Sequence, residues 1–216
     1  MHVGILGGTG PAGRGVAVRL AEAGVAVTVG SRDAARAAGV VGELTTTWPD
    51  LPGALEGADN AGAAAAELVV VATPWDSAIP TVRALREPLA HKVVVSMANA
   101  LLKEGREMLA LVPPRGSVAA AVQAALPESR VSAAFHHLPA SEMENLRSGL
   151  EADVLVCSDH PDATAATLDL VGCMKGLRPL DAGSLSQAAA IEAFTAVCIT
   201  LNMRHKAHST LRLAGI

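Results

Sequence analysis

Three glycines near the start of the chain have the spacing of a turn that binds phosphate groups. They occupy positions 8, 10 and 13, after the short apolar run Val3 to Leu6, which we expect to be a buried strand. Pro11 can open a helix there, because the N–H that proline lacks has no partner in the first helical turn. In such a unit the glycines permit a tight turn, close approach of a pyrophosphate and close packing of helix on strand. The spacing therefore predicts a dinucleotide site at a helix N-terminus, where unpaired N–H groups attract anions.

The end of the second predicted strand indicates which dinucleotide is bound. That strand, Val25 to Val29, is followed by Gly30-Ser31-Arg32, and Arg36 lies one helical turn further on. Proteins that bind NAD usually carry Asp or Glu at this place for the 2′-hydroxyl of the ribose. A hydroxyl and a guanidinium instead bind a 2′-phosphate through charge-assisted hydrogen bonds. Asp33 lies just beyond, but the pattern as a whole favours NADP.

Further candidate residues follow the ends of later predicted strands, where open α/β sheets bind ligands. These segments are Thr73-Pro74-Trp75, Ser96 to Leu101 and His136 to Ala140. For Trp75 the sequence leaves core packing as an equal alternative, and the His136-His137 pair can also be loop histidines without a binding role. No histidine or carboxylate lies at metal-ligand spacing from that pair, so we predict no metal site.

The composition argues against several classes of protein. The formal net charge is −4 and no Lys/Arg run is present, whereas nucleic acid binding needs a concentrated basic face. The three cysteines, at positions 157, 173 and 198, have neither paired nor metal-ligand spacing, which is typical of reduced thiols. No apolar run reaches the roughly 18 residues of a membrane helix, and no signal peptide pattern follows Met1. We therefore expect a cytoplasmic protein without a nucleic acid or membrane partner.

Strand and helix patterns alternate along the whole chain. We expect strands at 3–6, 25–29, 68–73, 92–96, 131–135 and 153–158, and an extended segment at 177–182. We expect helices from Pro11 to about residue 23, from Asp33 onward, from about Asp76 onward, and over 117–125, 162–171 and 184–203. The stretches 45–60 and 97–103 are expected to be irregular, and the basic tail 205–216 receives no assignment.

This alternation predicts an α/β fold with a doubly wound, mostly parallel sheet of the Rossmann type. Half of the residues are hydrophobic but only four are Trp or Phe, so alanine, valine and leucine must build the core. That composition suits a parallel sheet with helices packed closely on both faces. We expect residues 1–140 to form the NADP-binding Rossmann domain and residues 141–216 a small α/β C-terminal extension.

Several of these motifs resemble those of the F420H2:NADP oxidoreductases, also called NADPH-dependent F420 reductases. The resemblance covers nearly the whole chain, and the composition is similar to that of the actinobacterial branch. It is carried by Gly7-Gly8-Thr9-Gly10 with Gly30-Ser31-Arg32, by Thr73-Pro74-Trp75, by Phe135 to Ala140, and by Gly176 to Gly183. The last run is the most specific, because a generic dinucleotide fold does not require it.

The resemblance implies reversible hydride transfer between NADPH and the deazaflavin coenzyme F420, and it gives roles to individual residues. Thr9, Gly10, Pro11 and Ala12 would hold the pyrophosphate, and Ser31, Arg32 and Arg36 the 2′-phosphate. Trp75, Ser77 and Leu101 would line the cofactor channel, and the Ala140 backbone would fix the nicotinamide carboxamide. The deazaflavin would lie near Ala98, Asn99 and His136, with the region 141–216 completing its pocket.

No acid–base dyad is evident in the sequence, and both cofactors carry the chemistry themselves, so the protein mainly supplies position and electrostatics. We assign no residue a certain catalytic role; His136 is a candidate that could hydrogen-bond the carbonyl edge of the deazaflavin. Two other functions stay open. One is an NADPH-dependent reductase of a small carbonyl or imine, although such enzymes usually have a long helical second domain. The other is a non-catalytic NADP(H) sensor.

The last predicted helix indicates an oligomer. Between Ile191 and Leu201 it carries apolar residues on more than one face. A helix that is apolar beyond one stripe is usually buried by more than its own sheet. We therefore expect a homodimer, with burial wholly within one chain as the alternative.

Overall fold

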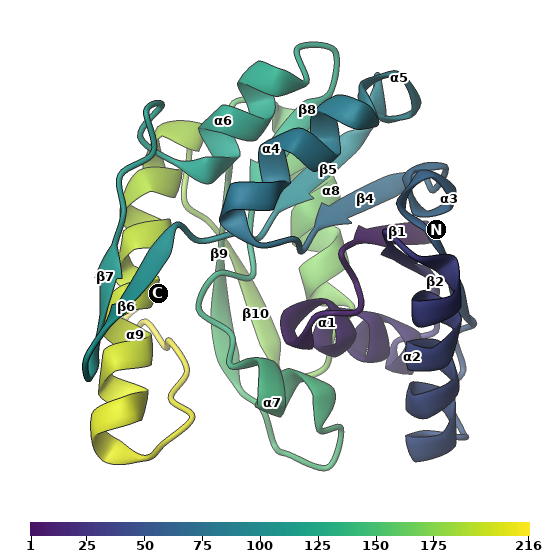
Figure 1. Cartoon of the computed structure of the whole chain (residues 1–216). Coiled ribbons are helices and arrows are strands. Elements are labelled where there is room, and N and C mark those ends of the chain that lie inside the picture. Colours follow the sequence, from purple (N-terminus) through teal and green to yellow (C-terminus); the bar gives the residue numbers. More distant parts are fainter.

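The computed structural model describes all 216 residues and arranges them as an eight-stranded sheet with helices on both faces (Figure 1). The spatial order is β10-β9-β8-β5-β4-β1-β2-β3. The strands are β1 (His2–Leu6), β2 (Ala26–Ser31), β3 (Leu55–Asp59), β4 (Leu68–Val71), β5 (Val93–Ser96), β8 (Arg130–Ala133), β9 (Ala152–Ser158) and β10 (Leu177–Asp181). All neighbours pair in parallel except β8 and β9, which are antiparallel. The predicted doubly wound, mostly parallel α/β fold is confirmed.

Two layers of helices bury the two faces of the sheet. The helices are α1 (Pro11–Glu22), α2 (Ala34–Thr47), α3 (Asn60–Ala64), α4 (Trp75–Ala84), α5 (Arg86–Leu89), α6 (Val118–Ala125), α7 (Ala140–Glu144), α8 (Pro161–Gly172) and α9 (Ala188–His205). Side chains alternate between the faces of a strand. Thus Val70 of β4 packs in the core with α1, α2 and α8, whereas Val69 and Val71 pack in the core with α3, α4 and α6.

Two segments that the sequence predicted to be irregular are ordered elements. Within 45–60, helix α2 continues to Thr47, and strand β3 then pairs with the outer edge of β2. Within 97–103, strand β6 (Leu101–Glu104) starts a hairpin with β7 (Glu107–Ala110). Both predictions were wrong for the same reason: these strands are largely exposed and lack an apolar pattern, and their partners β2 and α9 hold them in place.

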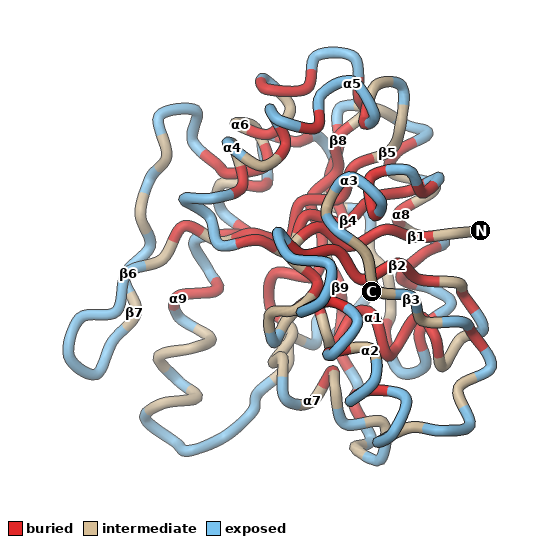
Figure 2. Tube along the Cα trace, turned by 45° about the vertical axis from the view of Figure 1, so that its right-hand side comes forward, coloured by how far each residue is buried: buried red, intermediate tan, exposed pale blue.

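Helix α9 packs against both the hairpin and helix α6. The Met108 N–H donates a hydrogen bond to the Thr200 hydroxyl (2.9 Å), which ties the hairpin to α9. The buried carboxylate of Glu192 accepts hydrogen bonds from the N–H groups of Val118 (2.8 Å) and Ala119 (3.0 Å) at the start of α6. Burial raises the pKa of Glu192 to about 7, although these two N–H donors oppose the shift. Figure 2 shows that α9 is buried mainly in its first half.

The C-terminal tail, which received no assignment from the sequence, is anchored on β9. The fully buried carboxylate of Asp153 accepts two hydrogen bonds from Arg178, at 2.8 and 2.6 Å, and one from the Leu213 N–H. The Arg178 guanidinium holds the pKa of Asp153 at about 2. Strands β9 and β10 continue the sheet beyond β8, so the elements after residue 140 share one sheet with those before it. The division into two domains at residue 140 stays a prediction.

Candidate functional site

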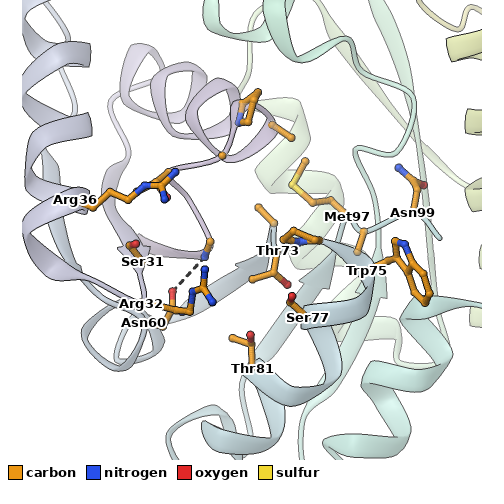
Figure 3. Close-up of a pocket in the computed structure, with 18 of the residues that line it drawn as sticks. Ser31, Arg32, Arg36, Asn60, Thr73, Trp75, Ser77, Thr81, Met97 and Asn99 are labelled. Atoms are coloured by element: carbon orange, nitrogen blue, oxygen red, sulfur yellow. Dashed lines mark hydrogen bonds between the residues drawn. The ribbon is translucent and has the colours of Figure 1, made fainter. Parts of the chain in front are cut away.

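A cleft of about 490 Å³ opens where the parallel strands β1, β2, β4 and β5 end (Figure 3). Open α/β sheets bind ligands where the strand order reverses, which here is the point between β1 and β4. The cleft is lined by Gly7, Thr9, Gly10, Pro11, Ala12, Ser31, Arg32, Arg36, Asn60, Ala72, Thr73, Pro74, Trp75, Ser77, Thr81, Met97, Ala98, Asn99 and Leu101. Folding thus brings together all the residues that the sequence predicted to bind the dinucleotide, except Ala140.

The glycine turn forms the floor of the cleft, and close packing excludes a side chain at Gly13. The Gly8 N–H donates hydrogen bonds to the carbonyls of Ile5 (3.2 Å) and Gly30 (2.8 Å), which fixes the turn against β2. A Cβ on Gly13 would lie 2.6 Å from the Gly8 Cα, so helix α1 can approach the turn only with glycine there. A Cβ on Gly10 would have only the Gly7 carbonyl oxygen nearby, at 3.6 Å. The space in front of Gly10 is therefore open to a ligand.

The first turn of helix α1 faces this open space with unpaired N–H groups. Gly10 is its N-cap and gives no side-chain capping bond, and Pro11 follows at the first helical position. No acidic residue lies in that turn. A helix start of this kind attracts anions through its free N–H groups and the positive end of its dipole. The residues present therefore fit a pyrophosphate.

The end of β2 supplies positive charge to one end of the cleft. Figure 3 shows the side chains of Arg32 and Arg36 on the same side of the cavity as Ser31. Asp33 does not line the cleft, because its carboxylate caps helix α2 by accepting hydrogen bonds from the N–H groups of Ala35 (2.9 Å) and Arg36 (3.4 Å). The carboxylate that the sequence left as a counter-argument to NADP is thus engaged by the backbone.

The rest of the lining includes polar and aromatic groups that follow β3 and β4, with Asn60 beside Arg32 and Trp75 at the far end of the cleft (Figure 3). Thr73 lines the cleft, and its buried hydroxyl has no hydrogen-bond partner in the protein. Trp75 lines the cleft with 38% of its surface exposed, so the core-packing alternative is wrong. The Asn60 side chain accepts a hydrogen bond from the Gly7 N–H (3.2 Å), which is drawn in Figure 3. Sequence reasoning missed Asn60 because its segment was expected to be irregular.

A second pocket of about 230 Å³ adjoins the end of the cleft away from the arginines. Its lining comprises Ala12, Met97, Asn99, Phe135, His136, His137, Leu138, Pro139, Ala140, Thr195, Cys198, Ile199 and Asn202. It shares Ala12, Met97 and Asn99 with the cleft, so the two cavities meet at these residues. Ala140 lies in this pocket, whereas Ala98 lines the cleft. Helix α9 lies in the region 141–216, which the resemblance assigns to this pocket, but its individual lining residues were not predicted, because no local pattern links that helix to the loops after β5 and β8.

His136 is buried in the wall of this second pocket. Its Nδ1 lies 3.0 Å from the Asn99 Oδ1, and its Nε2 is buried without a hydrogen-bond partner. Burial, assisted by the adjacent His137, lowers the pKa of His136 to about 3 despite an opposing effect of the Met97 backbone carbonyl. The ring is therefore neutral near pH 7. His137 is held differently, by the Ile191 carbonyl (2.8 Å) and the edge of the Phe194 ring.

No group of three or more His, Cys, Asp or Glu side chains is placed to hold a metal ion. The three cysteines are free, and burial raises the pKa of Cys198 in the pocket wall, which disfavours its thiolate. The ionisable groups around the pocket therefore offer neither a nucleophile nor a charged acid at neutral pH. What the arrangement can do is bind two ligands side by side, one in the cleft and one in the pocket.

Comparison with known proteins identifies relatives of the whole chain. The family model described as "NADP oxidoreductase coenzyme F420-dependent" matches residues 2–100. The F420-dependent NADP reductase of Methanocaldococcus jannaschii is 34% identical over 97% of this chain and 96% of its own length. That of Methanothermobacter thermautotrophicus is 33% identical over 100% of this chain and 94% of its own. A crystal structure from Arthrobacter sp. FB24, named as a candidate F420-dependent NADP-reductase, superposes with a TM-score of 0.81 at 28% identity and covers 98% of both chains.

The close contact between Gly13 and the glycine turn gives a direct test of the cleft floor. Gly13→Ala should lower the free energy of unfolding by about 1–3 kcal/mol, because its methyl group would overlap the Gly8 backbone. Gly42→Ala in helix α2 is the matched control, since nothing lies within 4 Å of its added Cβ. It should stabilise the fold by about 0.5–1 kcal/mol. Urea unfolding measures both, and equal effects of the two variants would contradict the packing argument.

Proposed function

The chain belongs to the F420-dependent NADP reductase family, and we propose that it transfers a hydride reversibly between NADPH and the deazaflavin coenzyme F420. The observation that carries the proposal is the pair of adjoining cavities that meet at Ala12, Met97 and Asn99. The cleft has the floor and the charges of a dinucleotide site. The pocket adjoins the end of that site and could hold the ring system of the deazaflavin there.

The cleft supports an extended NADPH molecule with its 2′-phosphate at one end and its pyrophosphate further along. We propose that Thr9, Gly10, Pro11 and Ala12 hold the pyrophosphate at the start of α1. Ser31, Arg32 and Arg36 would bind the 2′-phosphate, which carries the charge that NADH lacks. Trp75, Ser77 and Leu101 would line the cofactor channel, and all three border the cleft.

The nicotinamide then reaches the junction of the two cavities. We propose that the Ala140 backbone holds its carboxamide, which agrees with the position of Ala140 in the second pocket. The deazaflavin would lie beyond it, near Ala98, Asn99 and His136. Holding the two reacting carbons about 3–3.5 Å apart, away from water, is the main rate contribution that such a site can make.

The two cofactors supply the redox chemistry: the C4–H bond of the dihydronicotinamide breaks, both electrons leave with the hydride to form a C–H bond at C5 of the deazaflavin, and a ring nitrogen takes a proton from solvent. NADPH is oxidised and F420 is reduced, so no further reactant is needed. The protein residues bind and orient the two cofactors and exclude water from between the reacting rings. The neutral His136 ring cannot serve as an acid at pH 7, since its pKa is about 3. This favours a positioning role for it.

The test is the visible absorbance of oxidised F420 mixed with NADPH and the protein. We expect bleaching that requires both the protein and NADPH. If the absorbance stays constant while NADPH fluorescence shows binding, the second ligand is not F420. Oxidation of NADPH by a small carbonyl or imine would then support the alternative reductase, and no oxidation with any substrate would support a sensor.

The 2′-phosphate site makes a prediction about cofactor choice. Arg32→Asp should weaken NADPH binding by about 10- to 100-fold, because it removes charge-assisted hydrogen bonds and adds repulsion. NADH binding should change less than about threefold, since NADH has no phosphate at that position. Arg83→Asp, on the exposed end of helix α4, is the control. Fluorescence titration with both cofactors measures the difference, and equal losses would remove Arg32 from the phosphate site.

We propose that the chain acts in the cytoplasm as a homodimer joined through α9. Its three free cysteines are consistent with a reducing compartment. The segment Leu185–His205 has the length and composition of a membrane span with a mean hydropathy of 1.2, but it holds the buried Glu192 carboxylate. Phe194, Val197 and Leu201 are exposed on it by 42%, 49% and 44%. A second copy of the same face could cover them.

Light scattering without detergent tests this assembly. We expect twice the 21.9 kDa mass of the chain at micromolar concentration, and Val197→Glu should convert it to the monomer by placing charges in the interface. Ile216→Glu, at an exposed residue outside the helix, should leave the dimer intact. A monomeric wild-type protein would contradict the proposal.

A further inference from the structure

The amide side chain of Asn99 is held at the junction of the two cavities by groups from two other elements. Its Oδ1 lies 3.0 Å from the His136 Nδ1 and 3.2 Å from the Thr195 hydroxyl of helix α9. Its Nδ2 donates a hydrogen bond to the His136 backbone carbonyl at 3.3 Å. His136 and Thr195 are 5% and 4% exposed, so these contacts lie almost entirely out of water.

The partners of Asn99 fix which way its amide faces. The His136 carbonyl can only accept a hydrogen bond, so the amide nitrogen must lie toward it. The amide oxygen then faces the His136 Nδ1 and the Thr195 hydroxyl, both of which can donate; the single hydrogen of that hydroxyl is also within reach of the His136 carbonyl (3.2 Å) and the Ile191 carbonyl (3.5 Å). With the amide oxygen, which can only accept, placed at the His136 Nδ1, we assign the one proton of the neutral ring to Nδ1 and none to Nε2.

One hydrogen of the amide remains without a partner in the protein. The Asn99 Nδ2 has two hydrogens, and the His136 carbonyl receives only one of them. Asn99 is partly exposed and borders both the cleft and the pocket. By contrast, the Nε2 of His136 is covered by other atoms. Among Asn99, His136 and Thr195, the group that can bind a ligand is therefore the second N–H of the Asn99 amide.

We propose that Thr195 is a positioning residue, which together with His136 orients Asn99 so that its free N–H is donated to a ring carbonyl oxygen of the deazaflavin. This rests on the proposed function. Figure 3 shows Asn99 at the end of the cleft away from Arg32 and Arg36, where the ring systems rather than the phosphates would lie. The pocket beyond Asn99 is closed by Cys198, Ile199 and Asn202 of α9, the helix that carries Thr195.

An N–H donor at Asn99 would stabilise the negative charge that develops on the deazaflavin during hydride transfer. A hydride that enters the deazaflavin brings two electrons, and the ring carbonyl oxygens become more negative as it arrives. A fixed N–H donor stabilises that charge more strongly in the transition state than in the oxidised ground state. Thr195 and His136 hold the Asn99 amide in one orientation. An amide that rotated freely would have to be reoriented during the reaction.

Steady-state kinetics with NADPH and F420 compare the wild type with three variants of this network and one control. Thr195→Val keeps the shape of the side chain but removes the hydroxyl, and it should lower kcat/KM for F420 about 3- to 10-fold. Thr195→Ser should restore activity to within about twofold, because the hydroxyl returns. Asn99→Asp keeps the size but cannot donate, and it should cost about 100-fold or more in kcat.

Thr200→Val is the matched control on the same helix. It also removes a threonine hydroxyl that takes part in a hydrogen bond, but that bond is with the hairpin. Its kcat and its KM for F420 should stay within about twofold of the wild type, whatever its melting temperature. The NADPH dissociation constant should change less than about twofold in the Thr195 variants. A parallel loss of NADPH and F420 affinity would place the donor on the nicotinamide and overturn the proposal, as would equal kinetic losses in the two Thr→Val variants.

Nitrogen-15 NMR tests the orientation without turnover. The His136 ring should show a protonated Nδ1 and a bare Nε2, and the Asn99 side-chain amide signals should shift in Thr195→Val but not in Thr200→Val. A proton on Nε2 would overturn the assigned orientation. If the expected signals are found but the wild type does not bleach F420, the network stands and the proposed substrate fails. If the wild type bleaches F420 but Thr195→Val matches it, the positioning role fails alone.

Discussion

The reversal of strand order between β1 and β4 is the constraint on which the rest of the structure depends. Successive helices leave the sheet in opposite directions there, and their N-terminal ends border an open cleft instead of covering it. Helix α3, which precedes β4 in the chain, packs closely against β1 and β2 at this point. A Cβ on Gly4 would lie 1.8 Å from the Ala63 carbonyl oxygen, and one on Gly30 would lie 2.7 Å from the Ala63 Cβ. Helix α3 therefore packs directly on the backbone of β1 and β2, and its first residue, Asn60, reaches the glycine turn.

The cleft and the pocket differ in charge, and this difference supports the proposed direction of the two ligands. Arg32 and Arg36 make one end of the cleft positive, and the free N–H groups of α1 extend this toward its middle. At the junction with the pocket the charges disappear, because burial keeps His136 neutral and its partner Asn99 is an amide. Phosphates favour the first end and uncharged rings the second. A hydride can then pass between two rings in a region where the protein offers dipoles but no competing acid.

Helix α9 connects the second cavity to the outer surface of the molecule. Glu192 secures it to the start of α6, and Thr200 secures the hairpin to it. One side of the helix brings Thr195 to the pocket, while its outer side exposes Val197 and Leu201. A change in the packing of α9 would therefore reach both the pocket wall and the exposed apolar face. This links the proposed dimer contact to the proposed position of the deazaflavin through a single helix.

The sequence by itself determined the α/β fold, the glycine turn and the position of Ser31 and Arg32 at the end of the second strand, because these depend on local spacing; it assigned Trp75, Ser77 and Leu101 to the cofactor channel only through the family resemblance. The turn at Gly8 and the helix start at Pro11 are encoded within one short segment, and parallel strands must end at one edge of the sheet. Only the tertiary structure decided the edge strand β3, the hairpin and the network of Asn99, His136 and Thr195. Asn99 and Thr195 are 96 residues apart, and their contact depends on how α9 packs on the loops after β5 and β8. No local pattern records that packing, since it is set by complementary surfaces that exist only once the sheet has formed.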